Sequence, residues 1–119
     1  MSHNANQIAF NIIYTRALKP TKSLDSEGYC KYRNNTNDCC FVGALIKDEH
    51  YNTNLELKTA KNPMVLEAVE ASLNISPDSD FLLLAQDLHD YCDTSNWIKE
   101  LENLAKEYNL TVPSNQTLS

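Results

Sequence analysis

The segment 28–51 (GYCKYRNNTNDCCFVGALIKDEHY) holds most of the unusual residues of this 119-residue chain, including both of its glycines. Three of the four cysteines, three of the six tyrosines and one of the two arginines lie there as well. A chain this poor in glycine retains one where a side chain would not fit or where φ must be positive. We therefore expect Gly28 and Gly43 to mark constraints on the backbone, and we expect specificity to reside in this segment.

The same segment predicts a β-hairpin. Residues 29–33 (YCKYR) and 39–42 (CCFV) are rich in aromatic and β-favouring side chains, and the five residues between them (NNTND) are turn-formers. Gly43 would let the chain leave the second strand. Beyond it, residues 48–51 suggest a single helical turn, and residues 52–61 suggest a loop that allows a short strand over 55–57.

Four helices are predicted around the hairpin. The first covers residues 4–18 with Asn4 or Asn6 as its cap, although the alternation of apolar residues there also fits a strand. The second covers about 63–74, with Asn62 as cap and Pro63 at the first helical position. Pro77 and Asp78 open a third helix near 79–92, and Ser95 caps a fourth near 96–109.

Apolar residues at helical spacing define the expected core. The third helix would bury Phe81, Leu84, Leu88, Tyr91 and Cys92, and the fourth would bury a stripe that begins at Trp97. The residues expected to be most deeply buried are Trp97, Leu101, Leu88, Leu84, Val69 and Phe41 or Val42. The predicted fold is α+β, with four helices packed on a small antiparallel hairpin. It would form a single domain over 1–119, with an ordered core of about 5–110 and a polar tail over 111–119.

Charge and composition narrow the classes of function. The formal net charge is −6 and is spread along the chain, so the basic stripe of a nucleic-acid-binding protein is missing. Acidity favours solubility and also suits contact with a basic surface on a partner protein. No segment approaches the roughly 20 apolar residues of a membrane span. The polar N-terminus does not resemble a signal peptide, which predicts a cytoplasmic protein with reduced thiols.

Two interpretations of the cysteines and histidines remain open. In the first, Cys40 or Cys39 is a nucleophile activated by His89, with Asp90 or Asp93 orienting the imidazole, as in a Cys-His hydrolase or transferase. In the second, the cysteines are small buried hydrophobes and His89 is a structural residue. A zinc site is not expected, because Cys30 and Cys39 are separated by eight residues rather than two to four. No metal or cofactor is predicted.

Arg33 is the main candidate for recognition, because its guanidinium can bind a carboxylate or phosphate in a planar, bidentate manner. The alternative is an exposed ion pair with Asp38 or Glu27. Carboxylates at 48, 49 and 87 are candidates for contact with a basic partner, and their alternative role is a solvated surface. The predicted binding residues are Tyr32, Arg33, Asp48, Glu49, Tyr51 and Asp87.

The order of these motifs resembles small proteins encoded by bacteriophages and mobile elements. Those proteins carry G-x-C-x-Y-R, then C-x-x-G-x-L-I-x-D-x-x-Y, then an H-D helix and a tryptophan in the last helix. The pattern covers about residues 28–110. It falls on Gly28, Cys30, Tyr32, Arg33, Cys40, Gly43, Leu45, Ile46, Asp48, Tyr51, His89, Asp90 and Trp97. The chain departs from the pattern around Lys47 and Leu57, where the family tends to have proline and a glycine-containing segment.

The resemblance implies an accessory protein that binds and inhibits a protein complex of the host. Such a protein would act as a counter-defence (anti-CRISPR-like) inhibitor, without direct contact to nucleic acid. The partner would be a host protein with a basic surface.

Overall fold

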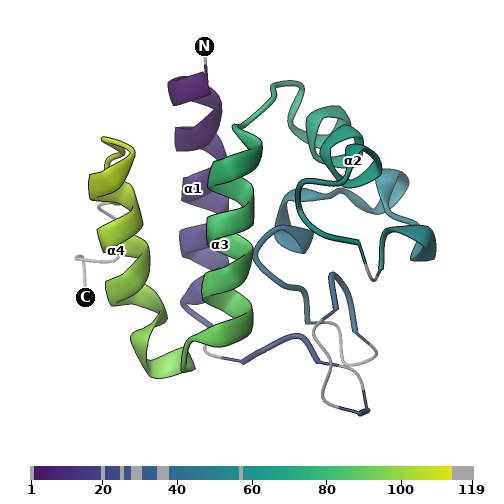
Figure 1. The fold of residues 1–119 in the computed structure, drawn as a ribbon, viewed down its shortest axis with the longest axis horizontal. Coiled ribbons are helices and arrows are strands. Elements are labelled where there is room, and N and C mark those ends of the chain that lie inside the picture. The colour runs from purple at the N-terminus through teal and green to yellow at the C-terminus, as the bar shows by residue number, and fades with distance from the viewer. Residues whose placement is uncertain are drawn as a thin grey trace.

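In the computed structural model, the chain forms four α-helices connected by segments that contain four short 3₁₀ turns (Figure 1). The structure describes residues 2–19, 21–24, 26–27, 31–34, 38–56 and 58–113, and all statements below concern these residues. The helices are α1 (Ser2–Ala17), α2 (Pro63–Leu73), α3 (Ser79–Tyr91) and α4 (Trp97–Glu107). The 3₁₀ turns are η1 (Gly43–Leu45), η2 (Asp48–His50), η3 (Thr53–Leu55) and η4 (Thr94–Asn96).

The long axes of α1, α3 and α4 run side by side, and α2 lies apart from them over the 3₁₀ turns (Figure 1). Helix α4 packs against both α1 and α3, whereas α2 packs against η1 and η2. Because η1 also contacts α1, the stretch around residues 40–46 lies between the three-helix layer and α2. Cys40, Phe41 and Val42 in this stretch have no exposed surface, so it forms the centre of the core.

Local signals set the bounds of α2 and α3 as predicted. The side chain of Asn62 accepts a hydrogen bond from the backbone N–H of Met64, and Pro63 occupies the first turn. Asn74, with φ of 60°, ends α2 in the left-handed conformation that asparagine tolerates. The helix predicted near 96–109 is confirmed by α4, but its predicted cap was wrong, because Ser95 lies within η4 and the residue before the helix is Asn96.

Helix α1 confirms the helical alternative for the N-terminal segment, and the strand alternative was wrong. Neither Asn4 nor Asn6 is its cap, because both lie inside the helix. Asn6 is buried and pairs with Asp78, accepting from its N–H at 2.8 Å and donating to its carboxylate at 3.2 Å. Gln7 pairs in the same way with the backbone N–H and C=O of Thr111, both at 2.8 Å. Two amide side chains of α1 therefore hold the start of α3 and the segment after α4.

The predicted hairpin was wrong, and with it the α+β class, because the described residues contain no β-strand. Among the described residues of the two expected strands, the pairing is a single isolated antiparallel bridge between Arg33 and Cys39. After Cys40 the backbone turns into η1, so the second strand cannot continue. The short strand that residues 55–57 would allow is also not observed, since Leu55 belongs to η3 and Leu57 lies outside the described residues. The helical turn predicted over 48–51 is confirmed by η2.

Gly43 lies where the backbone passes very close to that of Tyr32. A Cβ atom added at this position would lie 2.2 Å from the carbonyl oxygen of Tyr32. The glycine is therefore needed for a close approach of two backbones, and its φ does not lie in the left-handed region. Gly28 lies outside the described residues.

The core contains most of the residues predicted for it. Trp97, Leu101, Val69, Phe41 and Val42 have no exposed surface. For α3 the predicted face was wrong. The side chains that it buries are Phe81, Leu82, Ala85, Gln86 and His89. Leu84 is 40% exposed, Tyr91 is 82% exposed and Leu88 is half-buried. The helix is thus turned by about one residue, with two polar side chains inside and two large apolar ones outside.

Candidate functional site

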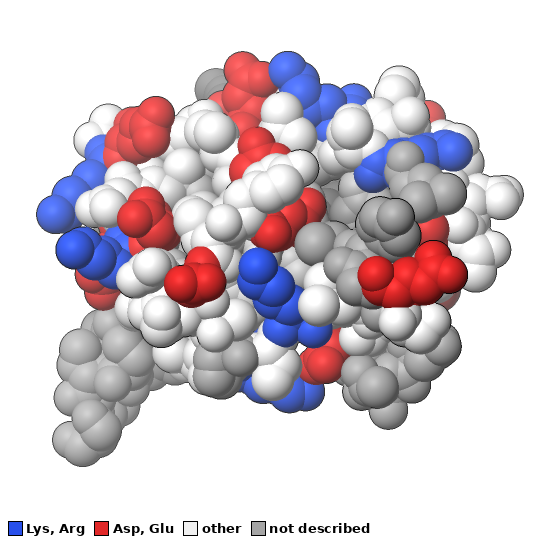
Figure 2. Space-filling model, turned by 60° about the horizontal axis from the view of Figure 1, so that its bottom comes forward, with Lys and Arg blue, Asp and Glu red and all other residues white. Residues whose placement is uncertain are grey.

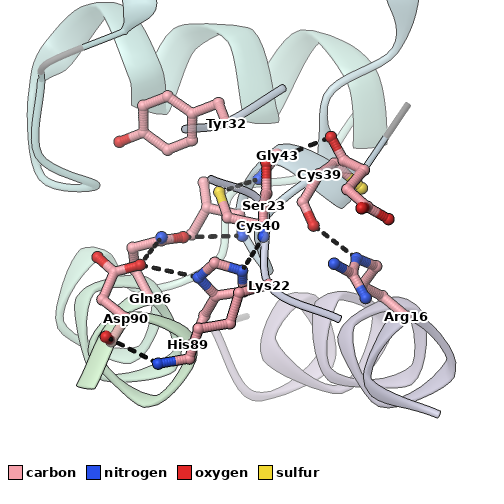
Figure 3. A network of polar contacts seen from close by, with 12 residues as sticks. Arg16, Lys22, Ser23, Tyr32, Cys39, Cys40, Gly43, Gln86, His89 and Asp90 are labelled. Carbon is pink, nitrogen blue, oxygen red and sulfur yellow. Dashed lines mark hydrogen bonds and ion pairs between the residues drawn. The ribbon is translucent and has the colours of Figure 1, made fainter. Parts of the chain in front are cut away.

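Figure 3 shows side chains from α1 and α3 converging on the stretch around residues 39–43. From α1, Arg16 donates hydrogen bonds to three backbone carbonyls, those of Cys39 at 2.5 Å, Lys19 at 2.9 Å and Thr21 at 2.6 Å. Its guanidinium also lies 5.8 Å from the ring centroid of Trp97. Arginine presents several donors in a fixed plane, so one side chain can fix several loop carbonyls. Arg16 therefore ties the chain after α1 to the start of the central stretch.

From α3, His89 is held at both ring nitrogens (Figure 3). Its Nε2 accepts a hydrogen bond of 3.1 Å from the backbone N–H of Ser23. A nitrogen that accepts cannot carry the proton, so the proton is assigned to Nδ1, which donates to Asp90 Oδ1 at 2.8 Å. Gln86 donates to the same carboxylate oxygen at 2.9 Å and accepts from the N–H of Val42 at 3.1 Å. His89 and Gln86 thus satisfy the buried backbone donors of Ser23 and Val42, respectively.

The surroundings of His89 favour the neutral imidazole. Burial lowers its pKa below the ordinary value, and the hydrogen bond to Asp90 opposes this effect without reversing it. The ring stacks on Trp97 at 5.2 Å between centroids and meets the edge of Phe41 at 5.3 Å. The lone pair that a general base would use is already engaged by Ser23.

The two adjacent cysteines do not form a thiolate site in this arrangement. Cys40 is fully buried, and its Sγ accepts a hydrogen bond of 3.2 Å from the N–H of Gly43. Burial raises the pKa of the Cys40 thiol, which keeps it protonated at neutral pH. Cys39 is half-buried, and its carbonyl accepts from Arg16. Among the described hydrogen bonds, none joins either sulfur to His89.

Three of the predicted binding residues meet in a second cluster. Arg33 forms an ion pair of 2.6 Å with Asp48 and donates to the carbonyl of Ile46 at 2.6 Å. Its guanidinium lies 4.6 Å from the ring centroid of Tyr51. The local pair with Asp38 was therefore wrong, because Asp38 pairs with Lys19 at 2.7 Å. The charge of Arg33 is used within the fold.

Glu56 holds this second cluster together. Its two carboxylate oxygens accept from the backbone N–H groups of Tyr32 at 2.9 Å and Arg33 at 3.1 Å. The hydroxyl of Tyr51 donates to Glu56 at 2.6 Å, and burial together with Glu56 raises the pKa of Tyr51 to about 12. Tyr32 is 5% exposed, its hydroxyl donates to the carbonyl of Lys58 at 2.6 Å, and burial raises its pKa. The two tyrosines thus act as protonated structural donors.

The predicted acidic residues lie on the outside. The side chains of Asp48 and Glu49 are 96% and 75% exposed, and Glu49 lies 3.5 Å from His50. Asp87 is exposed on α3 beside a hollow of about 210 Å³ that also touches Tyr32, Asp90 and Tyr91. These carboxylates are therefore accessible to a partner, unlike Cys40 and His89. Cys30 lies outside the described residues.

A separate groove of about 170 Å³ lies between α3 and α4. Its lining residues are Leu84, Leu88, Glu100, Asn103, Leu104 and Glu107. Apolar side chains and carboxylates thus meet there, and the sequence reasoning did not find this groove because it placed Leu84 and Leu88 in the core. On the face seen in Figure 2, acidic and basic residues are interspersed and no continuous basic stripe is visible.

Three residues with important roles, Arg16, Gln86 and Glu56, were missed from the sequence. Arg16 is the only charged residue among the first 18, and an isolated charge in a helix of this kind was the available signal. Gln86 and His89 are three residues apart and therefore share a helix face, which would have indicated a polar pair inside the apolar stripe of α3. For Glu56, no sequence signal distinguishes it from a solvated loop carboxylate.

Within the described part of the chain, no group of three or more histidine, cysteine, aspartate and glutamate side chains is placed to hold a metal ion. None of the helices described has the length and apolar character needed to cross a membrane. No protein-family model, curated protein or solved structure shows significant similarity to the chain.

Proposed function

We propose that this protein is a non-enzymatic binding protein that acts stoichiometrically in the cytosol by occupying a basic surface of a partner protein. One observation carries the proposal: the histidine and cysteine that the catalytic hypothesis requires are used inside the fold, while several carboxylates are exposed. His89 and Cys40 have no exposed surface. The side chains of Asp48, Glu49 and Asp80 are 96%, 75% and 74% exposed.

The charge of the molecule supports a basic partner. A net charge of −6 attracts a positively charged surface during encounter and accelerates association. Because exposed charges are screened by salt, such association weakens as ionic strength rises. The resemblance to phage and mobile-element proteins adds the nature of the effect. We propose with it that binding inhibits a protein complex of the host, as a counter-defence inhibitor does.

The Cys-His hydrolase or transferase is the competing proposal, and the geometry supports it less. Such an enzyme needs a thiolate within reach of a histidine whose lone pair is available. The Cys40 thiol is protonated and bonded to Gly43, and the lone pair of His89 is bonded to Ser23. Activity would therefore require a rearrangement of the core.

The experiment is affinity capture of partners from a host lysate, followed by titration of the captured protein at low and high salt. We expect one basic protein in a fixed ratio, with an affinity that falls steeply as salt rises. Charge reversal at exposed carboxylates (Glu49→Lys and Asp87→Lys) should weaken binding about tenfold or more together. Lys99→Glu, a matched reversal of opposite sign on α4, should not weaken it.

Two results would overturn the proposal. One is binding that does not depend on salt or on the two carboxylates. The other is turnover of an ester, thioester or amide substrate that disappears in Cys40→Ala or Cys39→Ser while the variant still folds. Under the binding proposal both cysteine variants retain the affinity of the parent protein.

A further inference from the structure

Helix α3 buries two polar side chains and exposes two large apolar ones, the reverse of the usual pattern. Gln86 and His89 are 8% and 0% exposed, whereas Leu84 is 40% exposed and Tyr91 is 82% exposed. Buried polar residues are explained by the backbone donors that they satisfy, those of Val42 and Ser23. The exposed apolar residues have no such structural explanation. Positions where a folded chain departs from the expected pattern are often functional.

The groove beside Leu84 combines an apolar floor with an acidic wall. Leu84 and Leu88 of α3 face Leu104 of α4, and the two helices run in opposite directions (Figure 1). Glu100 and Glu107 line the α4 side, and no lysine or arginine lines the groove among the described residues. These two carboxylates are seven residues apart on one helix, which separates them by about 10 Å along its axis.

The outer face of α3 continues this chemistry. Leu84 and Tyr91 are also seven residues apart, and the exposed Asp87 lies between them on the same face. The described contacts give the Asp87 carboxylate no hydrogen bond or ion pair, whereas Asp80, one turn before Leu84, is paired with Lys61 at 2.7 Å. Glu100 and Glu107 thus line the groove beside Leu84, and Asp87 lies next to it on the outer face of α3, at the hollow that also touches Tyr32.

We propose that this α3–α4 groove binds a basic amphipathic segment of the partner protein, an inference that rests on the proposed function and names its surface. Apolar side chains of the segment fill the space over Leu84, Leu88 and Leu104. Lysine or arginine side chains two helical turns apart pair with Glu100 and Glu107, and another meets Asp87. Helix-in-groove recognition of this type presents apolar anchors at spacings of three, four and seven residues.

The charges favour such a segment over a second copy of this chain. A copy would carry its own net charge of −6 toward the three carboxylates, and like charges facing each other oppose association. A purely apolar segment would leave the carboxylates desolvated and without a partner, which is also costly. A basic amphipathic segment would cover the leucines of the groove and also pair with its carboxylates.

The test uses two synthetic helical peptides and isotope-labelled protein. The first peptide has leucines along one face flanked by lysines, and the second has glutamates in place of the lysines. We expect only the basic peptide to bind, with amide shift changes concentrated at residues 84–91 and 100–107. Shift changes concentrated elsewhere, equal binding of both peptides, or no binding of either would overturn the proposal.

Matched variants distinguish binding at the groove from nonspecific apolar contact and from the effect of net charge. Leu84→Ser should weaken peptide binding about tenfold, the usual effect of removing an anchoring side chain. Met64→Ser, at the same 40% exposure on α2, should leave it within about twofold. Glu107→Lys should weaken binding severalfold more than Glu67→Lys, an exposed α2 residue whose reversal changes the net charge equally. Equal effects within either pair would overturn the proposal.

The same variants distinguish this inference from the proposed function. If Leu84→Ser retains the captured partner with unchanged affinity and salt dependence, the protein binds a basic partner through another surface. If neither the parent protein nor the variant retains a basic partner, the binding function itself is wrong.

Discussion

The carbonyl oxygen of Tyr32 determines why residue 43 is glycine. Any Cβ at that position would lie 2.2 Å from this oxygen, and both groups belong to buried backbone that cannot easily move. We expect Gly43→Ala to reduce the free energy of unfolding by roughly 2–3 kcal/mol, as overpacked core sites do. Urea denaturation measures the change. Ala71→Ser on the exposed face of α2 serves as control and should stay within about 0.5 kcal/mol. If Gly43→Ala reduced the free energy of unfolding as little as Ala71→Ser, the two backbones would be able to separate readily.

Because the pKa of His89 is lowered in the folded state, we expect the free energy of unfolding to decrease in mild acid. Its folded-state pKa lies below the ordinary value of 6.5 because burial disfavours the charged ring. The unfolded chain therefore binds the proton first, and stability is complete above about pH 6.5 and declines as pH falls from there toward the folded-state pKa. Unfolding free energies measured between pH 7.5 and 5.5 test this. In His89→Gln the decline over this range should shrink, and an unchanged slope would assign it to other groups.

At the scale of the elements, Trp97 docks α4 onto the rest of the molecule. Its ring meets Phe41 at 4.8 Å between centroids and stacks on His89, so α3, α4 and the central stretch join there. Trp97→Ala should cost roughly 3–5 kcal/mol, the range for emptying a large aromatic site. Trp97→Phe should cost clearly less, since the indole Nε1 has no hydrogen-bond partner among the described residues and little is lost with it. Thermal melts of both variants give the comparison, and equal losses would point to a missing polar contact.

The helices could be predicted from the sequence because their signals are local. Asn62, Pro63 and Asn74 set the bounds of α2 through bonds and backbone angles within a few residues. The conformation of residues 31–34 and 38–42 could not be predicted in this way, because it is set by distant groups. Arg16 binds the Cys39 carbonyl, Gln86 binds the Val42 N–H and Glu56 binds the N–H groups of Tyr32 and Arg33. These side chains form hydrogen bonds with backbone groups that would pair with a neighbouring strand in a β-hairpin.

The candidate site was predicted in part for the same reason. Motif residues 33, 48 and 51 do come together, since they lie close in the chain. The exposure of Leu84 depends on the rotation of α3, which is fixed by His89 and Gln86 bonding to segments 44 to 66 residues away. Helical periodicity alone counts Leu84 as apolar and assigns it to the core.

At the scale of the whole molecule, one core joins all four helices and the central stretch. Cys40 lies in it without exposed surface, so we expect its thiol to react only when the entire fold opens. In a variant with the other three cysteines replaced by serine, the rate of thiol exchange at Cys40 gives the free energy of the opening that exposes this thiol. We expect it to equal the free energy of global unfolding measured in urea. A markedly lower value would reveal a partial opening around residues 39–43. Fast alkylation of the native protein at neutral pH would contradict the buried, protonated thiol.

The amide pairs of α1 have a consequence during protein synthesis. The hydrogen bonds of Asn6 cannot form until Asp78 has been synthesised, and those of Gln7 cannot form until Thr111 has been added 104 residues later. At about 5–20 residues per second, the ribosome needs roughly 5–20 s to deliver that partner. Throughout this interval α1, which carries the buried residues Phe10, Ile13 and Tyr14, lacks the cover that α4 supplies in the finished protein. The hydrogen bonds between Gln7 and Thr111 therefore form only after residue 111 has been synthesised, and until then part of the apolar face of α1 is uncovered.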